Sequence, residues 1–233
     1  LVSDSWNHCV RSIDLDTLQV ETIAGTGEAG FSGDGGDAVN ARFDYVMCIA
    51  LDPAGRTIHI ADLKNRRVRN VDRTTGIVET VCGNGQRGVP VDGSQAKNSP
   101  LIDPRAVASD TDGNLYVLER GGHALRVVRP DGTIRTVAGT GEKGFHDGAA
   151  LESRFASPKH ICCDPEGRVY IADDLNGAIR RDDPSTELVS TVLGRGIGDA
   201  RIELLHPHGV RWHKGWLYVL DTGQHRVIKV RCP

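Results

Sequence analysis

The stretch Asp62-Leu63-Lys64-Asn65-Arg66-Arg67-Val68-Arg69 decides the fold, because its pattern recurs along the chain. The pattern Asp-x-x-Asn-x-x-Val-Arg also begins at position 4 and, with Ile in place of Val, at position 173. More divergent copies begin at 119 and 221. Successive copies are 58, 57, 54 and 48 residues apart. Repeats of roughly 40 to 50 residues that carry several strands each are typical of propeller blades.

One repeat, residues 46–82, contains four short runs rich in β-branched side chains. These runs are 46–51, 57–61, 66–72 and 77–82, and turn signals such as Asp52-Pro53-Ala54-Gly55 separate them. The later copies repeat this order. We therefore expect an all-β fold, a β-propeller of four-stranded antiparallel blades, formed by residues 1–233 as a single domain.

Longer blocks surround the motif in a fixed order. A glycine block, Gly-x-Gly-x-x-Gly-Phe-x-Gly-Asp-Gly, precedes an apolar-Asp-Pro-x-Gly turn and then Ile-Ala-Asp-x-x-Asn-x-x-Val-Arg. The best copies are 25–38 with 60–69 and 139–148 with 171–180. This order resembles the NHL-repeat family over essentially the whole chain. The resemblance implies a β-propeller, most often with six blades.

Five repeats are visible, and the terminal ones are incomplete. The first copy begins at its second strand, and the last copy stops after its third. We therefore expect the five repeats to be part of a six-bladed propeller in a longer chain, because open edges of terminal sheets are normally covered.

Composition excludes several classes of partner. The net charge of −3 gives no bulk attraction to nucleic acid or to anionic membranes. No apolar run approaches the roughly 18 residues of a membrane span, so we expect no membrane insertion. We also expect no signal peptide within these residues, because no basic segment precedes an apolar one.

The cysteines replace small or apolar residues of the repeat. Cys82, for example, stands where other copies have Ala24 and Ala138. Without Cys-x-x-Cys or Cys/His ligand spacing, free core thiols are expected in place of disulfides or metal ligands. This usage favours a reducing, cytoplasmic compartment. The six are Cys9, Cys48, Cys82, Cys162, Cys163 and Cys232.

The glycine block matches the dinucleotide fingerprint at 25–30, but that site needs a following helix, and the pattern recurs at 83–88 and 139–144. We interpret it as a turn element. The Asp-Gly pairs of the same loops are likewise interpreted as turns and not as calcium loops. Asp62 and Asn65 are expected to bond nearby backbone amides as Asx-type turns do.

The candidate binding site lies where the long loops meet the channel mouth. The position that opens the inner strand of each blade carries Met47, Arg105, Lys159 and His208, and His160 follows one step on. This ring is positively biased and suits an acidic side chain or anion. Long loops on a rigid scaffold commonly carry function. We therefore predict a non-catalytic scaffold that recognises a protein or peptide partner here, without a cofactor or a metal.

Two other functions stay open. A channel-centred enzyme of the lyase or lactonase type is the second, because the resemblance extends to propeller lyases that hold a metal in the channel. Its candidate ligands are His160, His206, His208 and His213, although the matching positions of other blades lack histidine. RNA binding through a basic face is the third, but stacking aromatics are few. Most of its arginines recur at third-strand positions that we expect on the blade surface. The set is Arg66, Arg67, Arg69, Arg73, Arg126, Arg129, Arg135, Arg180 and Arg181.

Overall fold

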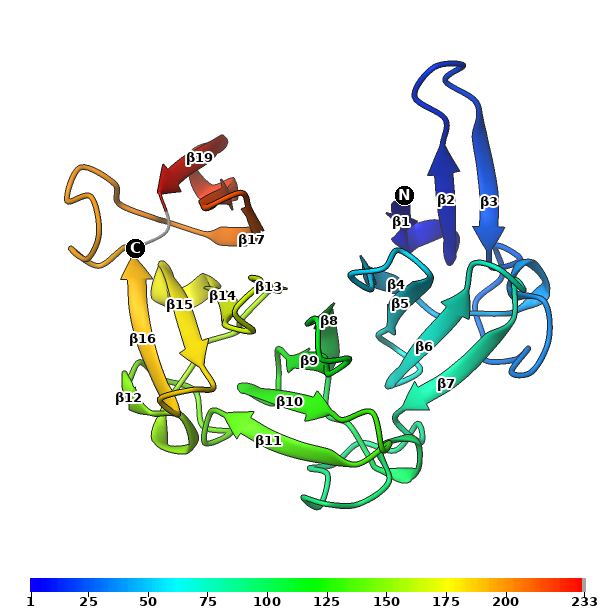
Figure 1. The fold of residues 1–233 in the computed structure, drawn as a ribbon, viewed down its shortest axis with the longest axis horizontal. Helices are drawn as coiled ribbons and strands as arrows, with labels where there is room; N and C mark the ends of the chain where they lie inside the picture. The colour runs from blue at the N-terminus through cyan, green and yellow to red at the C-terminus, as the bar shows by residue number, and fades with distance from the viewer. Residues whose placement is uncertain (232–233) are drawn as a thin grey trace.

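In the computed structural model, which describes residues 1–231, five antiparallel sheets form an arc of propeller blades around a channel (Figure 1). Blade 1 holds β1 (Val2–Asp4), β2 (Cys9–Ile13) and β3 (Val20–Ala24). Blade 2 holds β4 (Val46–Leu51), β5 (Thr57–Asp62), β6 (Arg67–Asp72) and β7 (Val78–Cys82). Blade 3 holds β8 (Pro104–Ser109), β9 (Leu115–Glu119), β10 (Ala124–Val128) and β11 (Ile134–Ala138).

Blade 4 holds β13 (His160–Cys163), β14 (Val169–Asp173), β15 (Ala178–Asp183) and β16 (Leu188–Leu193), with the two-residue β12 (Gly148–Ala149) on its outer edge. Blade 5 holds β17 (Pro207–His213), β18 (Trp216–Asp221) and β19 (Arg226–Arg231). Six single turns of 3₁₀ helix lie between strands: η1 (Ser5–Asn7), η2 (Ala38–Asn40), η3 (Ala96–Asn98), η4 (Ala150–Glu152), η5 (Asp174–Asn176) and η6 (Thr222–Gln224).

The predicted all-β propeller of antiparallel blades is confirmed, and its strand boundaries fall close to those expected. Blades 2 and 3 have four strands, the two terminal blades have three, and blade 4 has five. Two faces follow from this order. The loop face carries the long loops 25–42, 83–99 and 139–154 together with the turns between the second and third strands. The short-turn face carries turns such as 52–56.

Each long loop pairs with the outermost strand of the next blade. In blade 2 the amide of Ala38 donates to Gly76 O (2.8 Å), and the amide of Val78 donates to Gly36 O (3.0 Å). In blade 4 the same contact forms β12, which pairs with β16. This pairing was not predicted. It covers part of an edge that would otherwise expose unpaired backbone groups.

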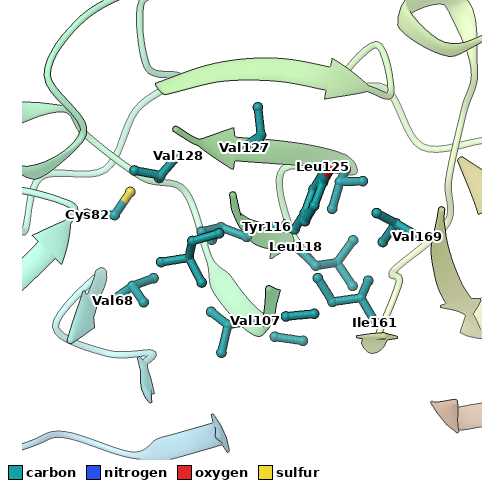
Figure 2. Packing of buried hydrophobic residues seen from close by; sticks show 14 of the residues in the cluster. Val68, Cys82, Val107, Tyr116, Leu118, Leu125, Val127, Val128, Ile161 and Val169 are labelled. Carbon is teal, nitrogen blue, oxygen red and sulfur yellow. The ribbon is translucent and has the colours of Figure 1, made fainter. Parts of the chain in front are cut away.

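The largest apolar cluster fills the layers on either side of blade 3 (Figure 2). Val68 and Cys82 of blade 2, Leu118 and Leu125 of blade 3 and Ile161 of blade 4 all belong to it. Every residue of β9 is buried. A central blade packs against neighbours on both faces, which is why its strands do not alternate between apolar and polar side chains.

The recurring Asp and Asn tie the blade to the preceding loop, so the expected local Asx-type turn is wrong. Asp62 Oδ1 accepts the amide of Asp44, 18 residues earlier (2.8 Å). Asn65 Nδ2 donates to both Asp62 oxygens (3.0 and 2.9 Å) and to Gly30 O (2.7 Å). The pair therefore acts as a clamp between the turn and the long loop.

The motif arginine is buried at the centre of this clamp, which corrects the expected surface position of Arg69 and Arg180. Both side chains are 0% exposed. Arg180 pairs with Asp173 (2.9 Å) and with Asp147 of the loop, and Arg69 pairs with the corresponding Asp34 (2.7 Å). In blades 2 and 4 the Asp of the Asp-Gly pair thus holds the arginine of the following blade, whereas Asp92 accepts the amide of Thr136 (2.8 Å) in blade 3. The glycine of each pair provides the expected turn with positive φ.

The first glycine of each block is required by close packing. A Cβ at Gly83 would lie 2.2 Å from Arg66 O, and φ is +90°. Gly25, Gly139 and Gly194 face the equivalent carbonyls at 2.5, 2.4 and 2.3 Å. The glycine pattern is therefore accounted for by the contact between the long loop and the turn beneath it.

Cys9, Cys48, Cys82 and Cys163 are free thiols, as predicted. The first three are buried, and burial raises the pKa of Cys82 to about 12. Cys162 is also buried, and its sulfur accepts the amide of Trp212 (3.1 Å). The prediction for Cys232 falls outside the described residues.

Candidate functional site

A hollow of about 420 Å³ opens on the loop face between blades 2 and 3. It brings together Met47 and Arg105, two residues that the sequence placed at the channel mouth. The second-to-third-strand turns of both blades complete it, and those contributions were not predicted. Its lining consists of Tyr45, Met47, Leu63, Lys64, Arg66, Ile102, Asp103, Arg105 and Arg120.

Positive charge dominates this hollow. Its single acid, Asp103, is bound by Arg120 Nε (2.8 Å) and by the amide of Gly121 (3.2 Å). Arg105 has no ion pair within residues 1–231, and its buried Nε lacks a hydrogen-bond partner there. Burial, followed by the neighbouring charge of Arg120, lowers the pKa of Arg105. The hollow therefore holds a partly buried guanidinium that forms no ion pair within residues 1–231, although the charges of Asp103 and Asp174 act on it from farther away.

Lys159 and His208 lie apart from that hollow, around a buried carboxylate that the sequence analysis missed. Asp174 is 3% exposed and lies next to the motif residue Asp173. Its carboxylate faces Lys159 Nζ (3.4 Å), His206 Nδ1 (3.0 Å) and His208 Nε2 (3.5 Å). The doubled acid at 173–174, which other copies lack, was the available signal. This group joins the loop-face ends of blades 4 and 5.

The two groups influence each other electrostatically. Burial is the largest cause that lowers the pKa of Lys159, and the charge of Arg105 comes next. The pKa of His208 is also lowered, mainly by burial and against the attraction of Asp174. Arg105 and Lys159 therefore contribute to one positive region around the channel mouth.

His160 lies deeper, in a cavity of about 720 Å³ lined largely by the inner strands β4, β8, β13 and β17 and by the turns of the short-turn face. Its Nδ1 is buried and has no partner within the described part of the chain. Burial lowers its pKa to about 4, so the ring is neutral at pH 7. The predicted set of five residues is thus divided among the hollow, the Asp174 group and the channel.

The histidines considered for zinc do not converge. His206 and His208 both face Asp174, whereas His160 lines the channel. Among residues 1–231, no group of three His, Cys, Asp or Glu side chains is arranged to hold a metal ion. The arginines considered for RNA also separate, because Arg69, Arg126 and Arg180 are buried, against the expected surface position, and Arg66 lines the hollow.

Trp6, in the equivalent turn of blade 1, is a further feature of the loop face that the sequence analysis missed. Its side chain is 78% exposed, and its ring meets the edge of Tyr45 with centroids 5.0 Å apart. Lys64 Nζ lies 5.4 Å from the centre of the Tyr45 ring. The exposed Trp6 ring therefore lies beside the partly buried Tyr45 ring at the edge of the positively charged hollow.

Several curated proteins are similar to this chain in sequence. The chain is 26% identical over 243 residues to protein SUPPRESSOR OF QUENCHING 1, chloroplastic, of Arabidopsis thaliana, covering 95% of this chain and 23% of that protein. It is 39% identical over 101 residues to human NHL repeat-containing protein 2, covering 42% and 14%. It is 27% identical over 205 residues to Teneurin-m of Drosophila melanogaster, covering 77% and 7%.

The resemblance to the NHL-repeat family is confirmed by the similarity to NHL repeat-containing protein 2. No protein-family model matches the chain. These NHL repeats span less than a quarter of the length of each of these curated relatives. No helix among residues 1–231 has the length and apolar character needed to cross a bilayer.

Solved structures share the propeller fold of this chain. The nidogen/laminin complex contains a chain that superposes with a TM-score of 0.66 at 17% identity, covering 96% of this chain and 67% of that one. Streptogramin B lyase superposes with a TM-score of 0.58 at 14% identity, covering 97% and 63%. At these identities the likeness concerns the propeller fold alone.

Proposed function

We propose that this chain is a non-catalytic binding module whose loop face recognises an acidic segment of a protein or peptide. The observation that carries the proposal is Arg105, which is held at the hollow without a counter-ion. A carboxylate that entered the hollow would provide the missing partner. Arginine forms charge-assisted, often bidentate hydrogen bonds with carboxylates, and these are stronger than bonds between neutral groups.

The surroundings of Arg105 fit a macromolecular partner better than a small anion. Met47 supplies an adaptable apolar contact within the hollow, and Trp6 and Tyr45 offer aromatic area beside it. Tryptophan, tyrosine and arginine are the residues that most often dominate protein interfaces. Lys159 and His208 would extend the contact toward blade 5, and His160 would meet only a side chain that reaches into the channel.

Relatives with the same architecture are consistent with this role. A propeller of this fold takes part in the nidogen/laminin complex, so such a scaffold can present a protein-binding face. The alternative of a lyase- or lactonase-type enzyme rests on likeness of fold to streptogramin B lyase and to a putative gluconolactonase. Fold does not determine function, so no residue of the channel is assigned a catalytic role.

A peptide-display selection against the immobilised protein tests the proposal. We expect acidic sequences to be enriched, and their affinity to fall as salt rises. Arg105→Glu should weaken binding at least tenfold. Arg56→Glu, the same charge change on an exposed residue of the short-turn face, should leave binding unchanged. Enrichment of sequences without acidic residues, or equal losses for both variants, would refute the proposal.

Lys159 needs a milder substitution than charge reversal. Because its ammonium faces the buried Asp174, a glutamate there would place two carboxylates together and destabilise the fold. Lys159→Gln removes the charge while preserving a hydrogen-bond donor. We expect Lys159→Gln to lower the affinity for acidic peptides by a smaller factor than Arg105→Glu does, since Lys159 already has a counter-ion.

We also propose that residues 1–233 form a single domain and that their arc belongs to a six-bladed ring of four-stranded blades. The open space between blade 5 and blade 1 in Figure 1 and the three-stranded terminal blades support this proposal. Calorimetry should show one unfolding transition, since neighbouring blades share apolar layers. Two separate transitions would indicate two domains.

A further inference from the structure

Asp182 breaks the pattern of the repeat at a blade-core position. It pairs with Val169 across β14 and β15. The same position in the other described copies is apolar: Val71 pairs with Ile58, Val128 with Leu115, and Val230 with Leu217. In blade 1 the matching residue is Ile13. A carboxylate therefore stands where the architecture uses an aliphatic side chain.

The carboxyl group of Asp182 has no partner among the described residues. The residue is 3% exposed, its side chain makes no hydrogen bond or ion pair with any of them, and its oxygens are not fully enclosed because they face a pocket. Its neighbour Asp183 is engaged elsewhere, with the amide and hydroxyl of Ser185 (3.1 and 2.6 Å). An unpaired buried carboxyl is costly, and a position that needed only packing would keep the aliphatic residue.

This carboxyl group lines a pocket of about 470 Å³ between blades 3 and 4. Tyr116 and Val127 of blade 3 form part of the opposite wall, and the Tyr116 hydroxyl is occupied by Asp110 (3.3 Å). The exposed side chains Arg129, Arg135, Asp92 and Glu187 also line it, so both signs of charge lie toward solvent while Asp182 lies inside. The volume is within the range of small-molecule sites.

We propose that this interblade pocket binds a small zwitterion of amino-acid size. Its protonated amine would pair with Asp182, and its acidic group would meet Arg129 or Arg135. This pairing would satisfy the buried carboxyl and give the arginines an anion. The site is separate from the loop-face hollow, and it does not depend on the proposed binding of acidic peptides.

Binding should depend on pH in a defined direction. Burial, with a further contribution from Asp183, raises the pKa of Asp182 to about 7. An ammonium group requires the ionised carboxylate, so below this pKa binding must release a proton. The other charged groups at the pocket are Arg129, Arg135, Asp92 and Glu187. We expect affinity to rise by up to about tenfold per pH unit up to about pH 7 and then to level off.

Calorimetric titration with three probes of matched length tests the proposal: 4-aminobutyrate, n-butylamine and n-butyrate. We expect 4-aminobutyrate to bind best, n-butylamine to bind more weakly, and n-butyrate to give no heat. Asp182→Asn and Asp182→Val should abolish binding, whereas Asp183→Asn should preserve it. The valine variant restores the residue used by the other blades, so it should fold with an undiminished melting temperature.

Three results would overturn the proposal. The first is no binding of 4-aminobutyrate at about 10 mM, a concentration that would detect even millimolar affinity. The second is undiminished binding to both Asp182 variants. The third is equal affinity for n-butylamine and 4-aminobutyrate, which would contradict the role of the arginines.

Discussion

At the scale of single residues, the motif arginine contributes differently to stability in different blades, because its burial differs. In blade 4, Arg180 is fully buried between Asp173 and Asp147. In blade 1, Arg11 pairs with Asp4 (2.7 Å), but its side chain is 35% exposed. Breaking a buried ion pair leaves charges without partners, whereas a surface pair contributes little.

We therefore predict that Arg180→Ala will lower the free energy of unfolding by about 3–5 kcal/mol. Arg11→Ala should produce a much smaller loss. Urea denaturation followed by tryptophan fluorescence measures both. Similar losses for the two variants would mean that the buried clamp is not a major stabilising contact.

Asp182 gives a second prediction at this scale. Its pKa is raised to about 7 in the folded state, against roughly 4 in the unfolded chain. Between these values the unfolded state is ionised while the folded state keeps its proton. The free energy of unfolding therefore falls as the pH rises from 4 to 7, because ionisation of Asp182 is favoured in the unfolded chain. At about 1.4 kcal/mol per pKa unit, the loss is of order 2–4 kcal/mol.

Asp182→Val should remove this pH dependence. We expect the variant to gain stability over the wild type at pH 8 and to lose that advantage at pH 4. Parallel denaturation curves at the two pH values measure the difference, which cancels the contributions of other titrating groups. A constant difference between variant and wild type across this range would contradict the raised pKa.

At the scale of elements, two glycines of the long loops distinguish the cost of backbone strain at positive φ from the cost of a steric clash at Cβ. Gly83 and Gly93 both have positive φ, +90° and +85°. A Cβ at Gly93 would meet nothing within 4 Å, while one at Gly83 would lie 2.2 Å from Arg66 O. Gly93→Ala should therefore cost about 1–2 kcal/mol from backbone conformation alone. Gly83→Ala should lower the free energy of unfolding clearly more, because the added Cβ would also push the long loop away from the turn that contains Arg66. Urea denaturation measures both variants, and equal midpoints would rule out this close contact.

The strand positions could be predicted well from the sequence, whereas the contacts between the long loops and the blades could not. Runs such as 46–51 and 57–61 carry their own signals in β-branched residues and turns, so β4 and β5 fall where expected. The clamp could not be predicted, since Asp62 bonds an amide 18 residues away and not a neighbour. β12 contains only two residues and carries no alternating pattern.

At the scale of the whole molecule, the candidate site was predictable only where the repeat itself defines it. Met47 and Arg105 open successive inner strands, so the symmetry of the blades brings them to one mouth. His160 lies one residue further along its strand, and its side chain lines the channel instead. Asp174 and Trp6 come from turns whose positions depend on how neighbouring blades pack.

The central claim is that the loop face, and not the short-turn face, receives the partner. Hydrogen–deuterium exchange of the protein, free and saturated with a selected acidic peptide, tests it most directly. We predict slower exchange on binding in residues 62–66, 102–105 and 120–123, which surround the hollow. Residues 52–56 and 110–114, on the opposite face, should exchange at unchanged rates. Protection confined to those short turns, with none around Arg105, would contradict the proposed site.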